Sequence, residues 1–518
     1  MRVLIFHGYL LRGTGSNVYN ASLAQAMAEL GHEVHLLCQD AEAAELPWVD
    51  ALGSWREGAL SVNALRDPGH PGSVTVYRPQ IGGLLPVYVA DRYEGFEVKT
   101  FPELSEEELR RYLDANVEAV RDVVTTGGEP DAALANHLIM GPVILARAGL
   151  RFAIKVHGSD LSYTVRPHAA RFVPYAREGT DAAAGILVGS GHTAADLFVT
   201  VPDPGLSART RLGPPGVDVE RFRPRKREES EQAVAKLAAR LEAEQGDSDD
   251  SFARRGREAA VALREWSAGG PTLLFVGKLL VNKGADLLAA AWPLIHRRHP
   301  RRGGAEPRLL FVGFGAFRPG IEALLAALDQ GDLEAAREVA ARGRDYEGGE
   351  EGPLPILASF LADPPEGYEQ AAREAAGSAR LAGRLEHDEV AEVMPRADAF
   401  VMPSTFPEAF GMVPAEAAAC GVPPVSADHS GMREVSRQLA EAVGPELAPL
   451  LSFELDRGAV EAIADCVNGW LSVDRQNRER IGIQLARRVE ELWSWNRVAS
   501  GVIAASAGEL QSLPSVPE

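Results

Sequence analysis

The sequence predicts an α/β protein with two domains, each built around a parallel β-sheet. The chain has 518 residues, and because a domain typically takes roughly 150 residues, this length argues against a single compact domain. Apolar residues make up 46% of the chain and charged residues 24%, which excludes a wholly disordered chain. Short apolar runs alternate with amphipathic helical segments over two separate stretches, as is typical of parallel strands joined by crossover helices.

The first stretch opens with a strand, helix, strand unit. Apolar side chains at helical spacing over residues 21–30 predict the first helix, and Gly31 ends it. A capping box formed by Ser105 and Glu108 opens a later helix, which ends at the glycines 127 and 128. The predicted strands lie at residues 3–6, 34–37, 132–135, 152–156 and 186–188, and together they define one open α/β domain over residues 1–220.

The second stretch follows a segment of different composition. Residues 221–270 combine a basic cluster at 223–226, a run rich in Ala, Glu and Arg, and the acidic segment 246–250, so we expect a charged helical linker or insertion with a solvated loop. A second α/β domain is predicted over 271–480, with an insertion at about 316–378. We expect a C-terminal helix over 481–518 to cross back to the N-terminal domain. The strands of the second domain are predicted at 272–276, 309–312, 379–382, 399–402 and 423–425.

Charge and cysteine content narrow the functional classes. The chain has 53 Lys and Arg against 73 Asp and Glu, a net charge of −20 that disfavours a nucleic-acid partner. Three cysteines without a C-x-x-C pair argue against a disulfide framework or a zinc ribbon and fit a reducing cytoplasm. The apolar start is too short for a signal peptide, and no run of about 18 apolar residues predicts a membrane span.

Two glutamates mark a candidate site where a predicted strand turns into a helix. The strand at 399–402 runs into a Pro-Ser turn, a loop that contains Glu408 and Gly411, and an Ala-rich helix that contains Glu416. A helix start after such a loop exposes backbone N–H groups that suit an anion, and a carboxylate can accept hydrogen bonds from sugar hydroxyls. The alternative is a helix-capping acid and an unrelated surface acid.

Basic and histidine-containing turns follow two other strands. Lys278 and Lys283 lie after the strand at 272–276 and can neutralise a diphosphate, although two solvated lysines are the simpler interpretation. The strand at 152–156 runs into His157 and Asp160, which places both at the end of a strand, where ligands of parallel sheets bind. A packed or surface histidine is the alternative.

A glycine turn also follows the first strand. Gly13 and Gly15 let the backbone approach a ligand at the start of the first helix. A dinucleotide-binding fingerprint is the competing interpretation, but Val18 stands where its third glycine should fall.

These motifs together resemble those of the family-4 glycosyltransferases, which are retaining enzymes of the GT-B fold with an E-x7-E signature. The resemblance implies two Rossmann-like parallel-sheet domains that face each other across a cleft, with helical insertions. It covers about two-thirds of the chain and fails over about 40–70, 225–268 and 316–378. It implies that Glu408 contacts the donor sugar, Glu416 the nucleotide ribose, and Lys278 and Lys283 the diphosphate, although Lys278 replaces the commoner Arg.

The remaining matches extend the expected site. The family's turn implies that His157 lies against the donor sugar and leaving phosphate and that Asp160 lies near the acceptor. Gly13 and Gly15 fall on the acceptor side. Ser430 and Glu434 resemble an element that follows the last central strands. The residues implied to bind the donor through backbone amides or next to the base are Phe410, Gly411, Met412 and Val413, and Arg384 and Leu385, respectively.

The sequence thus predicts a cytoplasmic, retaining glycosyltransferase that moves a hexose from a nucleotide diphosphate sugar to a hydroxyl acceptor. The resemblance implies that it needs no metal or other cofactor, because the lysines and helix N-termini neutralise the diphosphate. Two alternatives stay open: another GT-B enzyme, such as a sugar-nucleotide epimerase or a phosphorylase, and a non-catalytic nucleotide-sugar-binding protein. A membrane-lipid acceptor also stays open, although Arg110 and Arg111 are interleaved with acids, as on a solvated helix face.

Overall fold

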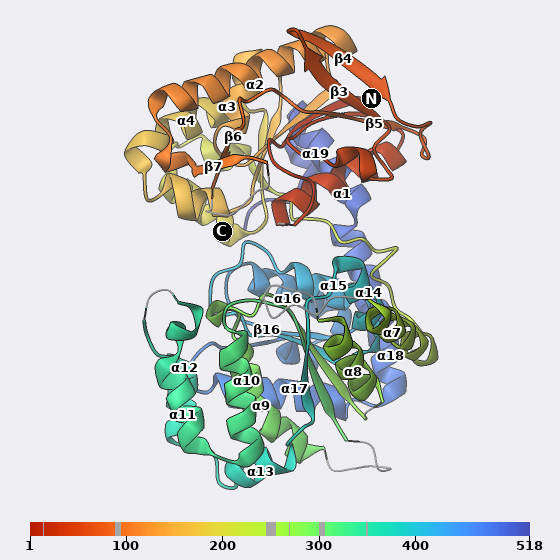
Figure 1. Ribbon diagram of the computed structural model, residues 1–518, viewed down its shortest axis with the longest axis vertical. Helices are drawn as coiled ribbons and strands as arrows, with labels where there is room; N and C mark the ends of the chain where they lie inside the picture. The colour runs from red at the N-terminus through yellow and green to blue at the C-terminus, as the bar shows by residue number, and fades with distance from the viewer. Residues whose placement is uncertain are drawn as a thin grey trace. The chain divides into compact units, whose positions relative to one another are not determined.

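The computed structural model describes residues 1–13, 15–88, 95–244, 255–268, 270–299, 306–348 and 351–517. The chain divides into two compact units (Figure 1), which are described separately. Unit 1 contains residues 1–216 and 493–518, and unit 2 contains residues 217–492. These boundaries differ from the expected ones at 220 and 481. The segment 221–270 is part of unit 2, and the chain re-enters unit 1 only at Trp493.

Unit 1 is built on a nine-stranded sheet with the order β11-β10-β9-β8-β1-β2-β5-β3-β4. All neighbouring strands are parallel except the β3–β4 hairpin. The central strands are buried along most of their length, as expected for a parallel sheet covered on both faces. The strands are β1 (Arg2–Phe6), β2 (Glu33–Leu37), β3 (Ala51–Arg56), β4 (Ala59–Ala64), β5 (Ser73–Tyr77), β8 (Ala132–Asn136), β9 (Ala153–Val156), β10 (Gly185–Val188) and β11 (Thr210–Leu212), with a separate pair β6 (Leu84–Val87) and β7 (Glu97–Thr100).

Helices cover the two faces of this sheet. One apolar cluster joins the sheet to α1 and α19, and a second joins it to α2, α3, α4 and α5. Figure 1 shows α19 beside α1, and these two helices pack together although they lie at opposite ends of the sequence. The predicted capping box of α2 is confirmed, because Ser105 N donates to Glu108 Oε2 at 2.8 Å and Glu108 N donates to Ser105 Oγ at 3.2 Å. The helices are α1 (Gly15–Glu29), α2 (Glu106–Gly127), α3 (Gly141–Ala148), α4 (Ala169–Ala182), α5 (Gly191–Thr200), α6 (Leu206–Arg209) and α19 (Trp495–Ala507).

Unit 2 is built on a six-stranded parallel sheet with the order β14-β13-β12-β15-β16-β17. Its strands are β12 (Thr272–Val276), β13 (Arg308–Val312), β14 (Ala379–Gly383), β15 (Ala399–Met402), β16 (Pro424–Ala427) and β17 (Ser452–Phe453). The helices between and around them are α9 (Ala285–Arg298), α14 (His387–Val393), α15 (Met412–Ala419), α16 (Ser430–Val443), α17 (Ala459–Ser472) and α18 (Arg475–Trp493). Because all strands are parallel, every strand-to-helix loop that follows a strand lies at the same edge of the sheet.

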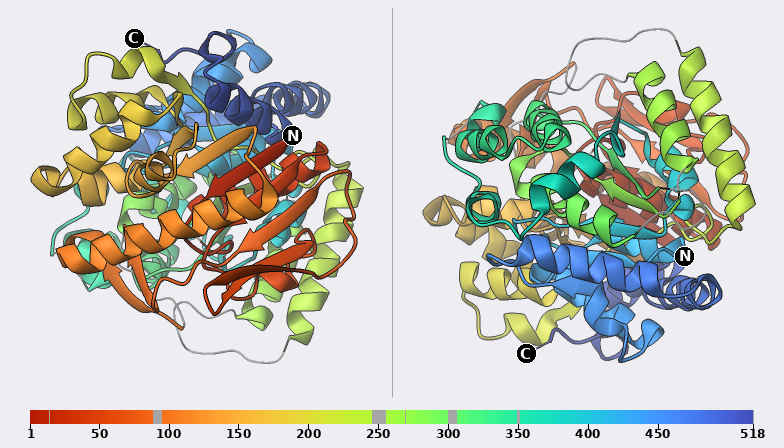
Figure 2. Two further views of the ribbon diagram at one scale, coloured as in Figure 1. Left: turned by 90° about the horizontal axis from the view of Figure 1, so that it is seen from above. Right: turned by 90° about the horizontal axis from the view of Figure 1, so that it is seen from below.

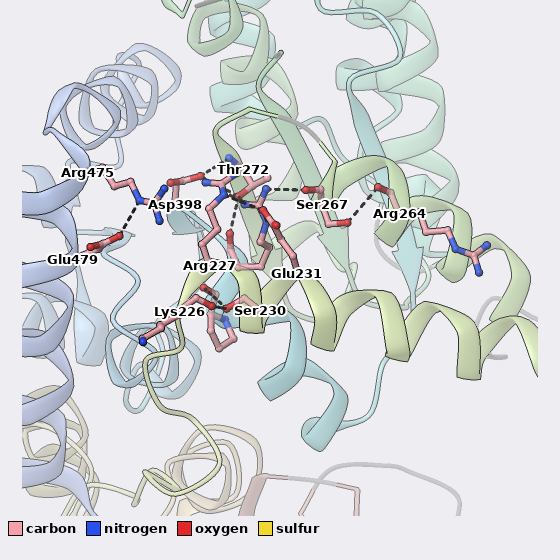
Figure 3. A network of polar contacts seen from close by, with 12 residues as sticks. Lys226, Arg227, Ser230, Glu231, Arg264, Ser267, Thr272, Asp398, Arg475 and Glu479 are labelled. Carbon is pink, nitrogen blue, oxygen red and sulfur yellow. Dashed lines mark hydrogen bonds and ion pairs between the residues drawn. The ribbon is translucent and has the colours of Figure 1, made fainter. Parts of the chain in front are cut away.

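The expected linker at 221–270 forms two helices, α7 (Arg227–Ala243) and α8 (Gly256–Ser267), which pack against each other. A network of polar contacts ties them to the amino ends of β12 and β15 (Figure 3). In it, the buried Arg396 donates to Thr272 Oγ1 and to Ser267 O, each at 2.8 Å. This helix pair is therefore part of the framework of unit 2. The acidic segment 246–250 lies outside the described residues.

The expected insertion at 316–378 forms helices between β13 and β14. They are α10 (Arg318–Gln330), α11 (Leu333–Arg342), α12 (Pro355–Ala362) and α13 (Tyr368–Glu374). Helices α10, α12 and α13 pack on α9, and Figures 1 and 2 show them grouped on one side of unit 2. None of the helices in the described ranges combines the length and the apolarity needed to cross a membrane.

Candidate functional site

The predicted site residues of unit 2 collect at the carboxyl edge of its sheet. Lys278 follows β12, Arg384 follows β14, Glu408 follows β15 and Ser430 follows β16. Loops at this edge of a parallel sheet are the usual place for a ligand, because the strand ends and the following helix starts expose polar backbone groups there.

Glu408 is held by three groups from separate loops. Lys283 Nζ donates to Glu408 Oε1 at 2.5 Å, and Ser404 Oγ donates to the same oxygen at 2.9 Å. The backbone N–H of Glu408 donates to Ser430 Oγ at 2.9 Å. The side chains of Lys283 and Glu408 are 21% and 24% exposed, so the pair is open to a ligand and only partly shielded from water. This arrangement leaves Glu408 Oε2 available to accept a hydroxyl.

The loops that carry this pair are joined by backbone contacts. Thr405 N donates to Asn282 O at 2.9 Å, and Ser404 Oγ lies 3.0 Å from the same carbonyl oxygen. Gly284, with φ of 69°, has no room for a side chain, since a Cβ there would lie 1.9 Å from Pro403 O. The turn after β12 and the loop after β15 therefore form one rigid support for Lys283 and Glu408.

The segment 410–413 leads from this loop into α15. Phe410 is 7% exposed, and Gly431 lies so close to it that a Cβ on Gly431 would come within 2.5 Å of Phe410 Cα. Gly411 precedes the first helical residues, Met412 and Val413, which are half-buried. Backbone N–H groups in a first helical turn have no partner within the helix, so this segment can bind an anion.

Glu416 points toward a histidine that the sequence interpretation missed. His387 Nε2 lies 2.8 Å from Glu416 Oε1, and their side chains are 44% and 5% exposed, respectively. Burial alone would lower the pKa of His387, but the charge and hydrogen bond of Glu416 outweigh it and raise the pKa above its usual value. The pair holds one carboxylate oxygen of Glu416 and leaves the other free for a hydroxyl ligand.

The strand ends of β12 and β14 add exposed cations. The Arg384 guanidinium lies 3.1 Å from Glu386 Oε1 and 5.4 Å from the centre of the Phe314 ring. Leu385 beside it is 9% exposed. Lys278 is exposed, and within the described ranges its ammonium group pairs with no carboxylate. Lys278 and Arg384 are thus accessible charges at the same sheet edge as Glu408.

In unit 1, His157 follows β9 and ends a buried polar chain. His7 Nε2 donates to Leu10 O at 2.8 Å, and Asn20 Nδ2 donates to His7 Nδ1 at 3.0 Å. Asn136 donates to Asn20 Oδ1, and its own Oδ1 lies 3.0 Å from His157 Nε2. In this chain of donors His157 Nε2 carries the proton, so Nδ1 keeps a lone pair.

Two histidines at this edge of unit 1, His7 and His157, have lowered pKa values. Burial, followed by the charge of His137, lowers the pKa of His7 to about 3. Burial and the nearby His137, Lys155 and His7 hold the pKa of His157 well below its usual value. A neutral imidazole can accept or donate a hydrogen bond without adding charge beside a ligand.

Asp160 is buried and its carboxylate is bound by backbone N–H groups, unlike an acid that is exposed to a ligand. It is 0% exposed, and its carboxylate accepts from Leu138 N at 2.5 Å, from Gly158 N at 3.1 Å and from Leu161 N at 3.0 Å. It therefore ties the turns after β8 and β9 together beneath His157. Contact between Asp160 and an acceptor stays a prediction.

The glycine turn after β1 is open. A Cβ on Gly13 or on Gly15 would meet no atom within 4 Å, and Gly13 adopts φ of 95°. Gly15 is the first residue of α1, whereas the residue between these glycines lies outside the described ranges. The backbone here is accessible to a ligand.

Several residues in contact with these predicted positions escaped the sequence interpretation. His137, at the end of β8, is 2% exposed and has φ of 65°, and its ring centre lies 4.9 Å from that of His157. A common signal marks several of them: a polar residue directly after a buried strand run. The missed residues are His7, Asn20, Asn136 and His137 in unit 1 and His387, Ser404 and His429 in unit 2.

Comparison with known proteins identifies part of unit 2. Residues 368–446 match the family model described as glycosyl transferases group 1, and this range contains Arg384, Leu385, Glu408 and Glu416. Over this range the chain is similar to the glycosyl transferases group 1 family. The resemblance expected from the motifs is confirmed at the level of this family, and the group 1 domain includes the carboxylates described above but neither Lys278 nor Lys283.

The chain is also similar to curated proteins that are named as a synthase and a mannosyltransferase. It is 29% identical over 245 residues to a glycogen synthase of Mycobacterium tuberculosis, which covers 46% of this chain and 51% of the relative. It is 23% identical over 441 residues to a GDP-mannose-dependent alpha-(1-6)-phosphatidylinositol monomannoside mannosyltransferase of the same organism, covering 83% of this chain and 88% of the relative. The chain thus spans about half the length of the glycogen synthase.

Solved structures show the fold class of the chain. A sucrose-phosphate synthase from Thermosynechococcus elongatus superposes with a TM-score of 0.54 at 18% identity, covering 99% of this chain and 98% of the other. Anabaena HepE in complex with UDP and glucose superposes with a TM-score of 0.53 at 15% identity, covering 99% and 100%. The expected GT-B fold class, with two α/β units and parallel sheets, is confirmed.

Proposed function

We propose that this protein is a retaining glycosyltransferase that moves a hexose from a nucleotide diphosphate sugar to a hydroxyl acceptor. The observation that carries the proposal is the carboxylate of Glu408, which lies 2.5 Å from Lys283 Nζ at the carboxyl edge of a parallel sheet within the group 1 domain. A carboxylate for sugar hydroxyls beside an ammonium for a phosphate is the pair of groups that a sugar phosphate requires.

The donor diphosphate is neutralised by protein groups in this proposal. Lys283 and the exposed Lys278 supply two positive charges, and the first-turn amides of Met412 and Val413 supply hydrogen bonds. Stabilising the departing diphosphate lowers the barrier to cleavage of the sugar–phosphate bond. We therefore propose a reaction that needs no metal and no other cofactor.

The two glutamates orient the donor. Glu408 accepts a sugar hydroxyl through Oε2, since Oε1 is engaged by Lys283 and Ser404. Glu416 accepts the ribose hydroxyls through the oxygen that His387 leaves free. Arg384 and Leu385 lie beside the base, and the segment from Phe410 to Gly411 lies against the sugar.

The remaining proposed roles belong to residues of unit 1. His157, neutral and with an unprotonated Nδ1, accepts a hydroxyl of the donor sugar, and Asp160 holds its turn in place. Gly13 and Gly15 lie on the acceptor side. In the proposed front-side course, the bond from the anomeric carbon to the acceptor oxygen forms as the bond to the diphosphate oxygen breaks, and the departing phosphate takes the acceptor's proton.

Donor turnover by the full chain tests this proposal. UDP-glucose is tried first because solved relatives include HepE with UDP-glucose, followed by ADP-glucose and GDP-mannose. The acceptors are free hexoses, an α-glucan and phosphatidylinositol vesicles, chosen from the names of the relatives. We expect release of a nucleoside diphosphate that EDTA leaves unchanged and, by NMR, a product with the anomeric configuration of the donor.

Other outcomes contradict the proposal in identifiable ways. An inverted product would refute retention, and loss of activity in EDTA that Mg²⁺ restores would refute metal independence. Consumption of free phosphate, or an isomerised donor, would indicate a phosphorylase or an epimerase. Tight binding of a nucleotide sugar without turnover against every acceptor would indicate a binding protein.

A further inference from the structure

The turn between β12 and α9 is held by backbone hydrogen bonds within the turn and by one to the loop after β13. Leu279 N donates to Phe314 O at 2.7 Å, Leu280 N to Lys278 O at 3.0 Å, Lys283 N to Leu280 O at 2.9 Å and Gly284 N to Val281 O at 3.2 Å. Val281 is 5% exposed, and its backbone N–H finds no carbonyl in the turn. This amide needs a partner from elsewhere, since an unpaired buried N–H is costly.

The partner comes from the insertion between β13 and β14. Glu347 Oε1 accepts from Val281 N at 2.7 Å across 66 residues of sequence. A carboxylate acceptor makes this a charge-assisted hydrogen bond, which is stronger than one between neutral groups. The insertion thus reaches the same turn that carries Lys278 at one end and Lys283 at the other.

The insertion holds Glu347 through its own backbone. Glu347 ends the short 3-10 helix Arg344–Glu347, and Gly348 follows it with φ of 70°. Arg344 N donates to Gly352 O at 2.8 Å, which closes the loop at its base. The Tyr346 ring packs edge-on against Phe317, with ring centres 6.0 Å apart, and Phe317 N donates to Leu279 O at 2.9 Å. The loop therefore contacts the turn directly through Glu347 and indirectly through Tyr346 and Phe317.

We propose that Glu347 is a positioning residue that holds the turn carrying Lys278 and Lys283 in its diphosphate-binding conformation. This inference rests on the proposed function for the role of the lysines. Its structural part, that Glu347 secures the Val281 amide, does not. Glu347 lies outside the residues 368–446 that match the family model, and through the Val281 amide it acts on the donor site without touching the donor.

The matched control lies in the same 3-10 helix. Asp345 has the same charge as Glu347 and is exposed, and its side chain makes no hydrogen bond or ion pair within the described ranges. Glu347→Ala removes the carboxylate, Glu347→Gln keeps an oxygen that can accept from Val281 N, and Asp345→Ala changes the net charge by the same amount as Glu347→Ala. The Gln variant separates the hydrogen bond from the charge.

Two measurements on the full chain test the inference. Hydrogen exchange followed by mass spectrometry reports on residues 279–284 without ligand: we expect faster exchange in Glu347→Ala than in wild type, Glu347→Gln and Asp345→Ala. Titration with UDP, ADP and GDP reports on the diphosphate site. We expect Glu347→Ala to weaken the tightest of them about tenfold, because a charge-assisted hydrogen bond contributes roughly the free energy of one decade in affinity.

In turnover, the same loss should raise the donor KM and leave kcat within about twofold of wild type. Unchanged exchange and unchanged nucleotide affinity in Glu347→Ala would overturn the inference. Equal losses in Glu347→Gln and Glu347→Ala would also overturn it, by assigning the effect to charge. Faster exchange in Glu347→Ala, together with a wild type that binds none of the nucleoside diphosphates, would refute the proposed function and keep only the structural part.

Discussion

At the scale of single residues, the candidate site depends on two carboxylates, Glu408 and Glu416. Side chains of the protein bind one oxygen of each carboxylate. Lys283 and Ser404 hold Oε1 of Glu408, and His387 holds Oε1 of Glu416. In each case one oxygen is fixed and the other is left to a ligand. The carboxylates are therefore oriented before a donor arrives, which lowers the entropy lost on binding.

The His387–Glu416 pair makes stability depend on pH. The pKa of His387 is raised in the folded protein, so the stabilisation from this pair is fully present below the unfolded value of about 6.5 and is lost as pH rises through the folded value. We expect His387→Gln to lower the melting temperature more at about pH 5.5 than at about pH 8.5. A difference between wild type and variant that stays constant across this range would contradict the assignment.

The two glutamates could be predicted from the sequence, whereas their partners could not. Glu408 and Glu416 lie in one continuous motif, and its resemblance to the E-x7-E signature singles them out. His387 contacts Glu416 and Ser430 contacts Glu408, each from the loop after another strand. Glu347 contacts the turn that carries Lys283, from the insertion. Such contacts depend on the tertiary structure. Asp160 was predicted from its turn, but a turn motif does not reveal that backbone amides occupy the carboxylate.

At the scale of elements, the site is a set of loops joined across adjacent strands. The turn after β12 is bonded to the loop after β15 through Asn282 O and to the loop after β13 through Leu279. Gly284 is where this joint is tightest, since any side chain would collide with Pro403 O. The loop conformation and the position of Lys283 should therefore change together.

Substitution of Gly284 tests this coupling. We expect Gly284→Ala to destabilise the protein by more than the roughly 1–2 kcal/mol of left-handed strain and to abolish donor turnover. The control is Gly149→Ala, which has the same left-handed conformation as Gly284, with φ of 85°, and has no atom within 4 Å of a Cβ, so it should show the strain alone. Urea unfolding and turnover measure both effects, and equal behaviour of the two variants would show that the joint does not position the site.

At the scale of the whole molecule, the fold class could be predicted because alternating apolar runs and helices indicate parallel sheets whatever the details. The boundaries could not, because they depend on which core each helix joins. Helix α8 belongs to unit 2 because it packs on β13 and β14, and α7 belongs to it because α7 packs on α8 and α14. Helix α19 belongs to unit 1 although α18 before it belongs to unit 2. Composition shifts do not report such contacts.

The return of the chain to unit 1 can be tested at α19. Val502 is 0% exposed in the core shared with α1 and the sheet, whereas Asn496 on the same helix is exposed. We expect Val502→Asp to increase hydrogen exchange at β8 in unit 1 and to leave β15 in unit 2 unchanged, since a buried unpaired charge destabilises the core that contains it. Asn496→Asp should change neither strand. Equal loss of protection in both units would contradict this division.

The net charge of −20 is a property of the whole molecule, whereas the candidate site contains positively charged side chains. In the proposed function, Lys278, Lys283 and the helix-start amides bind an anion in a protein of net negative charge. The account therefore depends most on whether the Lys283–Glu408 pair handles a sugar diphosphate.

The most direct measurement is nucleoside diphosphate release from UDP-glucose, ADP-glucose and GDP-mannose by wild type, Glu408→Gln and Lys283→Gln. We expect wild type to turn over at least one donor and each variant to lose on the order of 100-fold in kcat/KM, as when a group that stabilises transition-state charge is removed. Variants with wild-type turnover, or a wild type inactive with every donor, would contradict the account.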